Sequence, residues 1–162
     1  MTVFLAILMC LFPPSRGDVT RLQRAFPSYL TFETAEVHLI AARAAGVSRG
    51  IDSRLLLSIA AHESNFRADV RTPETRGRQS CGVMTPEPKV RCSRTDLTLV
   101  GGYDAGAAHL AEWRKFYRGR DLVLAYAGGG GLVTACHHGP WVVNDRDVCR
   151  IADDLTGPIV RL

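Results

Sequence analysis

The feature that most constrains the fold is the segment 55–61, which contains only apolar side chains and one serine. Asp52 precedes this segment at a helix N-cap position, so a buried helix is expected to begin there. Leu56, Ile59 and Glu63 are spaced at i, i+3 and i+7, which places the Glu63 carboxyl beside the core-facing aliphatic side chains. Burial disfavours an ionised carboxylate, and Glu63 is therefore a candidate proton donor for acid catalysis. The alternative is an ordinary solvated Glu in the last turn.

The remaining chain is expected to be mainly α-helical with one long irregular loop. Thr31 is placed to cap a helix of residues 32–45 that stops at Gly46. Residues 66–95 are rich in Pro, Gly and Arg and have no sustained period, which predicts a loop or a very short sheet after the Glu63 helix. Further helices are expected at residues 96–117, at 121–126 before four glycines, and at 145–155 with Trp141 nearby.

Length and composition indicate a single folded domain behind an apolar leader. The chain has 162 residues, of which 46% are hydrophobic and 22% are charged. Residues 3–12 are almost all apolar, but about ten such residues are too few for a membrane-spanning helix. They fit the apolar part of a secretory signal, so residues 1–17 are predicted to be a leader and 18–162 the domain. The alternative is an N-terminal helix packed into the fold.

The cysteines agree with export to an oxidising compartment, either the periplasm or the exterior. Removal of the leader with Cys10 leaves an even number of cysteines. We expect the two pairings between sequence neighbours, Cys81 with Cys92 and Cys136 with Cys149. The competing hypothesis is a zinc site with the ligand pool Cys136, His137, His138 and Cys149. Adjacent histidines point in different directions, and the usual ligand spacings are absent, so we expect no metal.

Three short blocks occur in an order that resembles the lytic transglycosylase domain. They are Glu63-Ser64, then Gly82-Val83-Met84-Thr85, and then Ala125-Tyr126-Ala127-Gly128. The family carries Glu-Ser at the end of a helix, then Gly-Leu-Met-Gln, and later Ala-Tyr-Asn-Ala-Gly. The resemblance covers residues 50–140 and implies a lysozyme-like helical fold.

The resemblance implies cleavage of the β-1,4 bond between N-acetylmuramic acid and N-acetylglucosamine in peptidoglycan. Glu63 would act as the catalytic acid and then as the base, and the product would be a 1,6-anhydro sugar. No cofactor is required. The implied partners are peptidoglycan glycan strands, in wall remodelling, in a secretion machine or in a phage assembly.

Four further residues are expected to bind the substrate or to orient the acid. Tyr126 is expected to donate a hydrogen bond toward Glu63, Ser64 to touch Glu63 or the substrate, and Met84 to form a wall of the groove. Thr85 stands where the family has Gln, and Ala127 stands where it has Asn. Because those amides help to bind sugar or to orient the acid, substrate preference or activity is expected to differ from that of the family.

Three alternatives remain open. Asp69 could activate water, which would give a hydrolase resembling goose-type lysozymes. A noncatalytic glycan-binding relative would keep the groove without turnover. The segment 41–49 with its Gly46, followed by a helix from Asp52, also has the pattern of a helix-turn-helix DNA reader, and a net charge of +4 would suit DNA. That second helix is too apolar to reach base edges, so we expect no nucleic-acid partner.

The long loop carries a concentration of positive charge that would suit an anionic cell-wall polymer. The alternative is a solvated surface. The basic residues of this loop are Arg67, Arg71, Arg76, Arg78, Lys89, Arg91 and Arg94.

Overall fold

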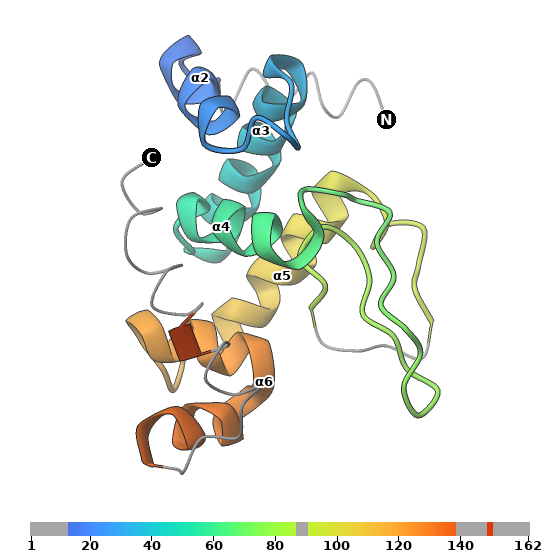
Figure 1. Ribbon diagram of the computed structural model, residues 1–162, viewed down its shortest axis with the longest axis vertical. Helices are drawn as coiled ribbons and strands as arrows, with labels where there is room; N and C mark the ends of the chain where they lie inside the picture. The colour runs from blue at the N-terminus through green and yellow to red at the C-terminus, as the bar shows by residue number, and fades with distance from the viewer. Residues whose placement is uncertain (1–12, 87–90, 139–148, 151–162) are drawn as a thin grey trace.

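The computed structural model describes residues 13–86, 91–138 and 149–150, and this part of the chain is mainly helical (Figure 1). The helices in these ranges are α2 (Arg16–Ala25), α3 (Phe32–Arg49), α4 (Ser53–Ser64), α5 (Leu99–Trp113) and α6 (Gly119–His138). The segment between α4 and α5 extends to one side as an irregular loop, drawn green to yellow in Figure 1. Isolated antiparallel bridges join Arg71 to Cys81 and Thr75 to Arg78 in this loop. The expected mainly α fold with a long irregular segment is confirmed.

Helix α3 is central to the packing, because it contacts α2, α4 and α5. Helix α5 also contacts α4 and α6, so the helices surround one core. Fully buried side chains from four helices fill this core: Ile40, Leu56, Leu57, Ile59, Tyr103, Leu110 and Leu124. Residues 56–60 of the apolar segment before Glu63 are therefore buried, as its composition predicted, and Leu55 and Ala61 are partly buried.

Two of the expected N-caps are confirmed. The Thr31 hydroxyl accepts a hydrogen bond from the Thr34 amide at 3.2 Å, and the Thr31 amide donates to the Thr34 hydroxyl at 2.8 Å. The Asp52 carboxylate accepts from the Arg54 amide at 2.9 Å. These side chains satisfy backbone donors that a helix start leaves unpaired, which is why both positions could be read from the sequence.

The predicted end of α3 at Gly46 is wrong, because the helix continues to Arg49 and ends at Gly50. Gly50 has a φ of 67°, a left-handed conformation that favours glycine. Gly46 serves close packing instead: a Cβ there would lie 2.6 Å from the Ile51 carbonyl oxygen. The glycine lets the chain fold back against α3. The turn that the DNA-reader pattern requires at Gly46 is therefore absent.

The other helix boundaries also differ from the sequence predictions. Helix α5 begins at Leu99, where the Thr98 hydroxyl accepts from the Gly101 amide at 3.1 Å, and it ends at Trp113. The glycine run interrupts α6 at Gly128 and Gly129 but does not end it, since helix resumes as far as His138. Trp141 and most of the predicted helix at 145–155 lie outside the described residues.

Both predicted disulfides are present. Cys81 pairs with Cys92 at a Cα–Cα distance of 6.0 Å, and Cys136 pairs with Cys149 at 5.9 Å. The first closes the loop that follows α4, and the second ties the end of α6 to a later segment. Cys136 and Cys149, the two cysteines of the competing zinc hypothesis, are therefore bonded to each other.

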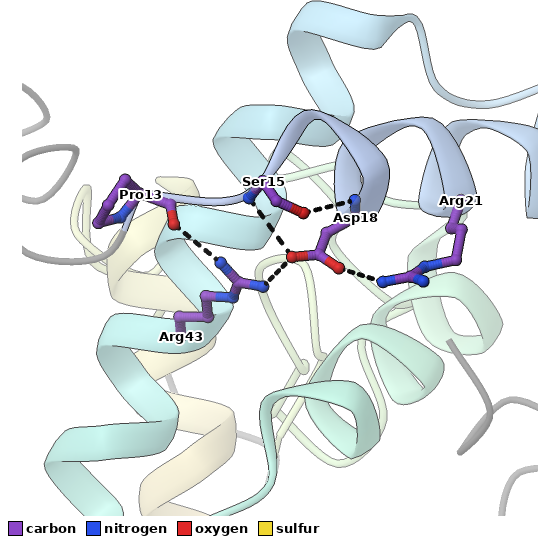
Figure 2. A network of polar contacts seen from close by, with 5 residues as sticks. All are labelled: Pro13, Ser15, Asp18, Arg21 and Arg43. Carbon is purple, nitrogen blue, oxygen red and sulfur yellow. Dashed lines mark hydrogen bonds and ion pairs between the residues drawn. The ribbon is translucent and has the colours of Figure 1, made fainter.

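The start of α2 is anchored to α3 through Asp18 (Figure 2). The Asp18 carboxylate accepts from the Arg43 guanidinium at 2.8 Å and also from Arg21, and Arg43 donates to the Pro13 carbonyl at 3.2 Å. The hydrogen bond from Arg43 lowers the pKa of Asp18 from 3.8 to about 2. Ser15 caps the helix. The predicted leader boundary at residue 17 therefore falls inside α2, and residues 1–12 lie outside the described ranges.

No helix in the described part of the chain is long and apolar enough to cross a membrane.

The buried imidazole of His38 predicts a loss of stability in mild acid. Burial lowers the pKa of His38 from 6.5 to about 4. His38 is therefore protonated near pH 6.5 in the unfolded chain but only near pH 4 in the folded chain. The stabilisation is complete above pH 6.5 and is lost as the pH falls toward 4, by about 3 kcal/mol. Urea unfolding at pH 7 and pH 4 measures this difference. A His38→Gln variant is expected to lose about 3 kcal/mol of that dependence.

Candidate active site

Glu63 lies in the last turn of α4, at the edge of the core. Leu56 and Ile59 on the same face are 0% and 2% exposed, whereas the Glu63 side chain is 28% exposed. The helix ends directly afterwards, because Asn65 adopts a left-handed conformation with a φ of 51°. Glu63 is thus anchored by buried neighbours while its carboxyl reaches the surface, which a proton donor to an external substrate requires.

Ser64 fastens the second sequence block to the end of α4. Its hydroxyl is buried and lies 2.9 Å from the Ala60 carbonyl and 2.7 Å from the Val83 carbonyl. Ser64 therefore contacts the backbone of the 82–85 segment. Its side chain positions this segment beside Glu63.

The Thr85 hydroxyl donates a hydrogen bond to the Glu63 carboxylate, with Oγ1 and Oε2 only 2.5 Å apart. These residues are 22 positions apart in sequence, so only the fold brings them together. Thr85, which departs from the family pattern, is therefore in direct contact with the candidate acid.

Tyr126 supports the same segment from α6. Its buried hydroxyl donates to the Met84 carbonyl at 2.6 Å, not to Glu63 as the sequence suggested. Burial, together with the negative charge of Glu63, raises the pKa of Tyr126 well above 10.0. The bond to the Met84 carbonyl places the third sequence block beside the segment whose Thr85 contacts the acid. Tyr126 thus holds the backbone next to Thr85.

The Met84 side chain is fully buried and packs against α5, so it does not line a surface groove as expected. A Cβ at Gly106 would overlap the Met84 sulfur, which explains why glycine stands at this point of α5. Met84 therefore anchors the 82–85 segment in the core. Its contribution is packing and one backbone acceptor.

Backbone strain is concentrated around the contact between Glu63 and Thr85. Within the described ranges, four residues other than glycine have positive φ angles, and three of them adjoin this contact. They are Asn65 at 51°, Phe66 at 64° and Thr85 at 39°; Arg76 lies in the loop. Such conformations persist only where the surrounding structure holds them, and they often occur at functional sites.

His62 is a site residue that the sequence interpretation missed. Its Nδ1 lies 3.7 Å from Glu63 Oε1, on the oxygen that Thr85 does not contact, and its side chain is 43% exposed. The interaction with Glu63 raises the pKa of His62 above 6.5. Only its position next to Glu63 in the sequence could have identified His62 as a site residue. The carboxylate thus lies between a hydroxyl donor and a titratable imidazole.

Asp69 is a solvated loop carboxylate. Its side chain is 77% exposed and lies 3.5 Å from the Arg67 Nε. The other described basic residues of the loop, Arg71, Arg76, Arg78, Arg91 and Arg94, are also exposed, and Lys89 lies outside the described residues. The loop therefore presents a positively charged surface.

The described part of the chain contains no group of three or more His, Cys, Asp or Glu side chains arranged to hold a metal ion. His137 lies 2.8 Å from the Asp121 carboxylate and links the two parts of α6. The arrangement around Glu63 offers proton transfer and hydrogen bonding.

The Cys81–Cys92 disulfide is expected to stabilise the segment that carries Thr85. Replacing both cysteines with Ala should lower the free energy of unfolding by about 3 kcal/mol, because the bond restricts an 11-residue loop in the unfolded chain. Urea unfolding measures the loss. The Cys136/Cys149 double Ala variant serves as the matched control, with a similar loss from a 13-residue separation. If only the second variant is destabilised, the first bond contributes no net stability.

No protein-family model matches this chain, and no curated protein matches it.

Proposed function

We propose that this protein is a peptidoglycan lytic transglycosylase with Glu63 as its acid and base. The observation that carries the proposal is the 2.5 Å hydrogen bond between Thr85 and Glu63, which joins the first two sequence blocks in space. Ser64 and Tyr126 fasten the same segment through the Val83 and Met84 carbonyls. The residues that carry the resemblance therefore form one connected arrangement around a partly buried Glu63 side chain.

The proposed reaction needs one carboxyl group. Protonated Glu63 gives its proton to the bridging oxygen, the bond to the muramic C1 breaks, and the N-acetylglucosamine leaves with a C4 hydroxyl. The acetamido oxygen of the muramic sugar attacks C1 from the opposite side. The C6 hydroxyl then displaces it, its proton returns to Glu63, and a 1,6-anhydro ring remains. The Thr85 hydroxyl donates a hydrogen bond to the Glu63 carboxylate, the group that receives this proton.

The exposed arginines of the long loop support an anionic polymer as substrate. The two disulfides and the apolar residues before position 13 support a periplasmic or secreted location. The glycan strands of peptidoglycan are the proposed partner there. Wall remodelling, a secretion machine and a phage particle are the settings in which such cleavage is used.

Mass analysis of the muropeptides released from purified peptidoglycan tests the proposal. The expected products carry a 1,6-anhydromuramic end, which is lighter than the hydrolysed end by the mass of one water molecule. Reducing-end products would instead assign a hydrolase that resembles goose-type lysozymes. The exposure of Asp69 and its ion pair with Arg67 argue against that second scheme, because a base for water must lie close to the sugar.

Two nonenzymatic alternatives have their own outcomes in this assay. A glycan-binding relative would sediment with peptidoglycan and release nothing. A DNA reader would need free side chains along α4, but Leu56, Leu57 and Ile59 are buried there. If the protein is retained on peptidoglycan but releases no fragment, its proposed function becomes glycan binding and not catalysis.

A further inference from the structure

A buried hydrogen bond between α3 and α5 lies directly behind the turn that follows Glu63. His38 Nδ1 and the Tyr103 hydroxyl are 2.9 Å apart. His38 is 4% exposed and Tyr103 is 0% exposed, so water does not compete for this bond. The proposed reaction uses neither group, and neither is a typical choice for an apolar core.

His38 also binds the backbone of the turn itself. A hydrogen bond to the Phe66 backbone opposes the effect of burial and raises the pKa of His38 relative to burial alone. Such a bond favours the protonated ring, so the imidazole is the donor and the Phe66 carbonyl is the acceptor. The Phe66 amide is already used, since it donates to the Ala60 carbonyl at 3.2 Å. The His38 imidazole therefore contacts both the Tyr103 hydroxyl and the backbone of the turn.

Aromatic contacts hold the Phe66 side chain on two sides. The His38 ring meets it edge to face with centroids 5.0 Å apart, and the Phe26 ring does the same at 5.1 Å. Phe66 is 5% exposed. Its side chain and its carbonyl are thus both fixed by residues from other parts of the chain.

The turn that these contacts stabilise has an unfavourable backbone conformation. Asn65 and Phe66 have successive φ angles of 51° and 64°, and residues other than glycine seldom adopt this left-handed conformation twice in succession. Local sequence does not favour such a turn, so contacts from elsewhere must hold it. Glu63 lies two residues before Asn65 in the last turn of α4, so the turn adjoins the end of the helix that carries the carboxyl in contact with Thr85.

We propose that His38 and Tyr103 form a buried clamp that fixes the turn at Asn65 and Phe66 and thereby positions the Glu63 carboxyl against Thr85. His38 and Tyr103 are positioning residues, since they act through the turn and do not touch the reacting atoms. The catalytic part of this inference rests on the proposed function. The clamp itself does not.

Tyr103→Phe is the variant that tests the clamp, because it removes one hydroxyl and keeps the buried ring. Hydrogen exchange of the backbone amides measures the turn, with Phe66 and Thr85 as reporters. The kcat and KM for release of anhydromuropeptides measure how the variant affects catalysis by Glu63. Val19→Ala is the control, because it shortens a fully buried side chain of α2 that is not part of the clamp. All proteins are compared at a temperature where they are fully folded.

We expect Tyr103→Phe to speed exchange at Phe66 by at least about tenfold, since the amide opens with the turn. The kcat should fall by about ten- to a hundredfold with KM nearly unchanged, because a small displacement of the acid acts on the chemical step. Val19→Ala should leave both quantities close to wild type.

Unchanged exchange at Phe66 in Tyr103→Phe overturns the clamp. Faster exchange with an unchanged kcat overturns the positioning role. An equal fall of kcat in Val19→Ala also overturns it, because general destabilisation would then explain the loss. If the wild type releases no anhydromuropeptides, the proposed function fails, and faster exchange at both Phe66 and Thr85 still supports the clamp.

Discussion

Glu63→Gln is expected to reduce the release of anhydromuropeptides by about 10²–10⁴-fold. The amide has the size of the carboxyl and can accept the hydrogen bond from Thr85, but it has no acidic proton to give to the glycosidic oxygen. Loss of activity without loss of structure is therefore expected. Digestion of peptidoglycan with equal amounts of variant and wild type, followed by mass analysis, measures the ratio.

Asp69→Asn is the matched control, because it makes the same chemical change on a carboxylate that is 77% exposed. Its activity should remain within about twofold of wild type, since an exposed ion pair contributes little. A large loss in Asp69→Asn together with reducing-end products would transfer the mechanism to the hydrolase scheme. Full activity in Glu63→Gln would remove Glu63 from catalysis.

Gly82→Ala is expected to have the largest effect on folding. Gly82 has a φ of 86°, and a Cβ at this position would overlap the Asp96 carbonyl oxygen. The left-handed conformation and the steric overlap each cost about 1–3 kcal/mol. Because backbone forms the obstacle, it cannot move aside as a flexible side chain can. Urea unfolding should show a loss of about 2–6 kcal/mol. The movement of the segment should also displace Thr85 from Glu63.

Gly77→Ala separates the two causes. Gly77 also has a left-handed conformation, with a φ of 71°, but among the described residues a Cβ there would approach only a Glu74 carboxylate oxygen, at 4.0 Å. This variant should lose only the conformational part, about 1 kcal/mol. It should retain its activity, because the tip of the loop has no contact with Glu63 among those described. Equal losses in both variants would show that the overlap at Gly82 is relieved by a small shift.

The features that the sequence determined by itself are those whose causes lie within a few residues. The caps at Thr31 and Asp52 depend on a side chain and an amide two or three positions away. The burial of the segment before Glu63 follows from its composition. The two disulfides join cysteines only 11 and 13 positions apart, so the local pairing could be chosen correctly.

Glycine shows where local rules stop being sufficient. A glycine after a run of helix formers predicts a helix end, and Gly50 has that role. Gly46 has the same local appearance, but it lies inside α3 because the chain around Ile51 returns against it. Whether a glycine ends a helix or admits a neighbouring backbone depends on what packs against it. That information is not local.

Only the tertiary structure decided the partners of the polar groups around Glu63. The sequence placed Tyr126 against the acid, yet its hydroxyl bonds the Met84 carbonyl, 42 residues away, and Thr85 makes the contact with Glu63. The pairing of His38 with Tyr103, 65 positions apart, had no sequence signal. A hydroxyl group can satisfy its hydrogen bond with any acceptor within about 3 Å. Which acceptor comes that close depends on how α3, α4, α5 and α6 pack, and on no short stretch of residues.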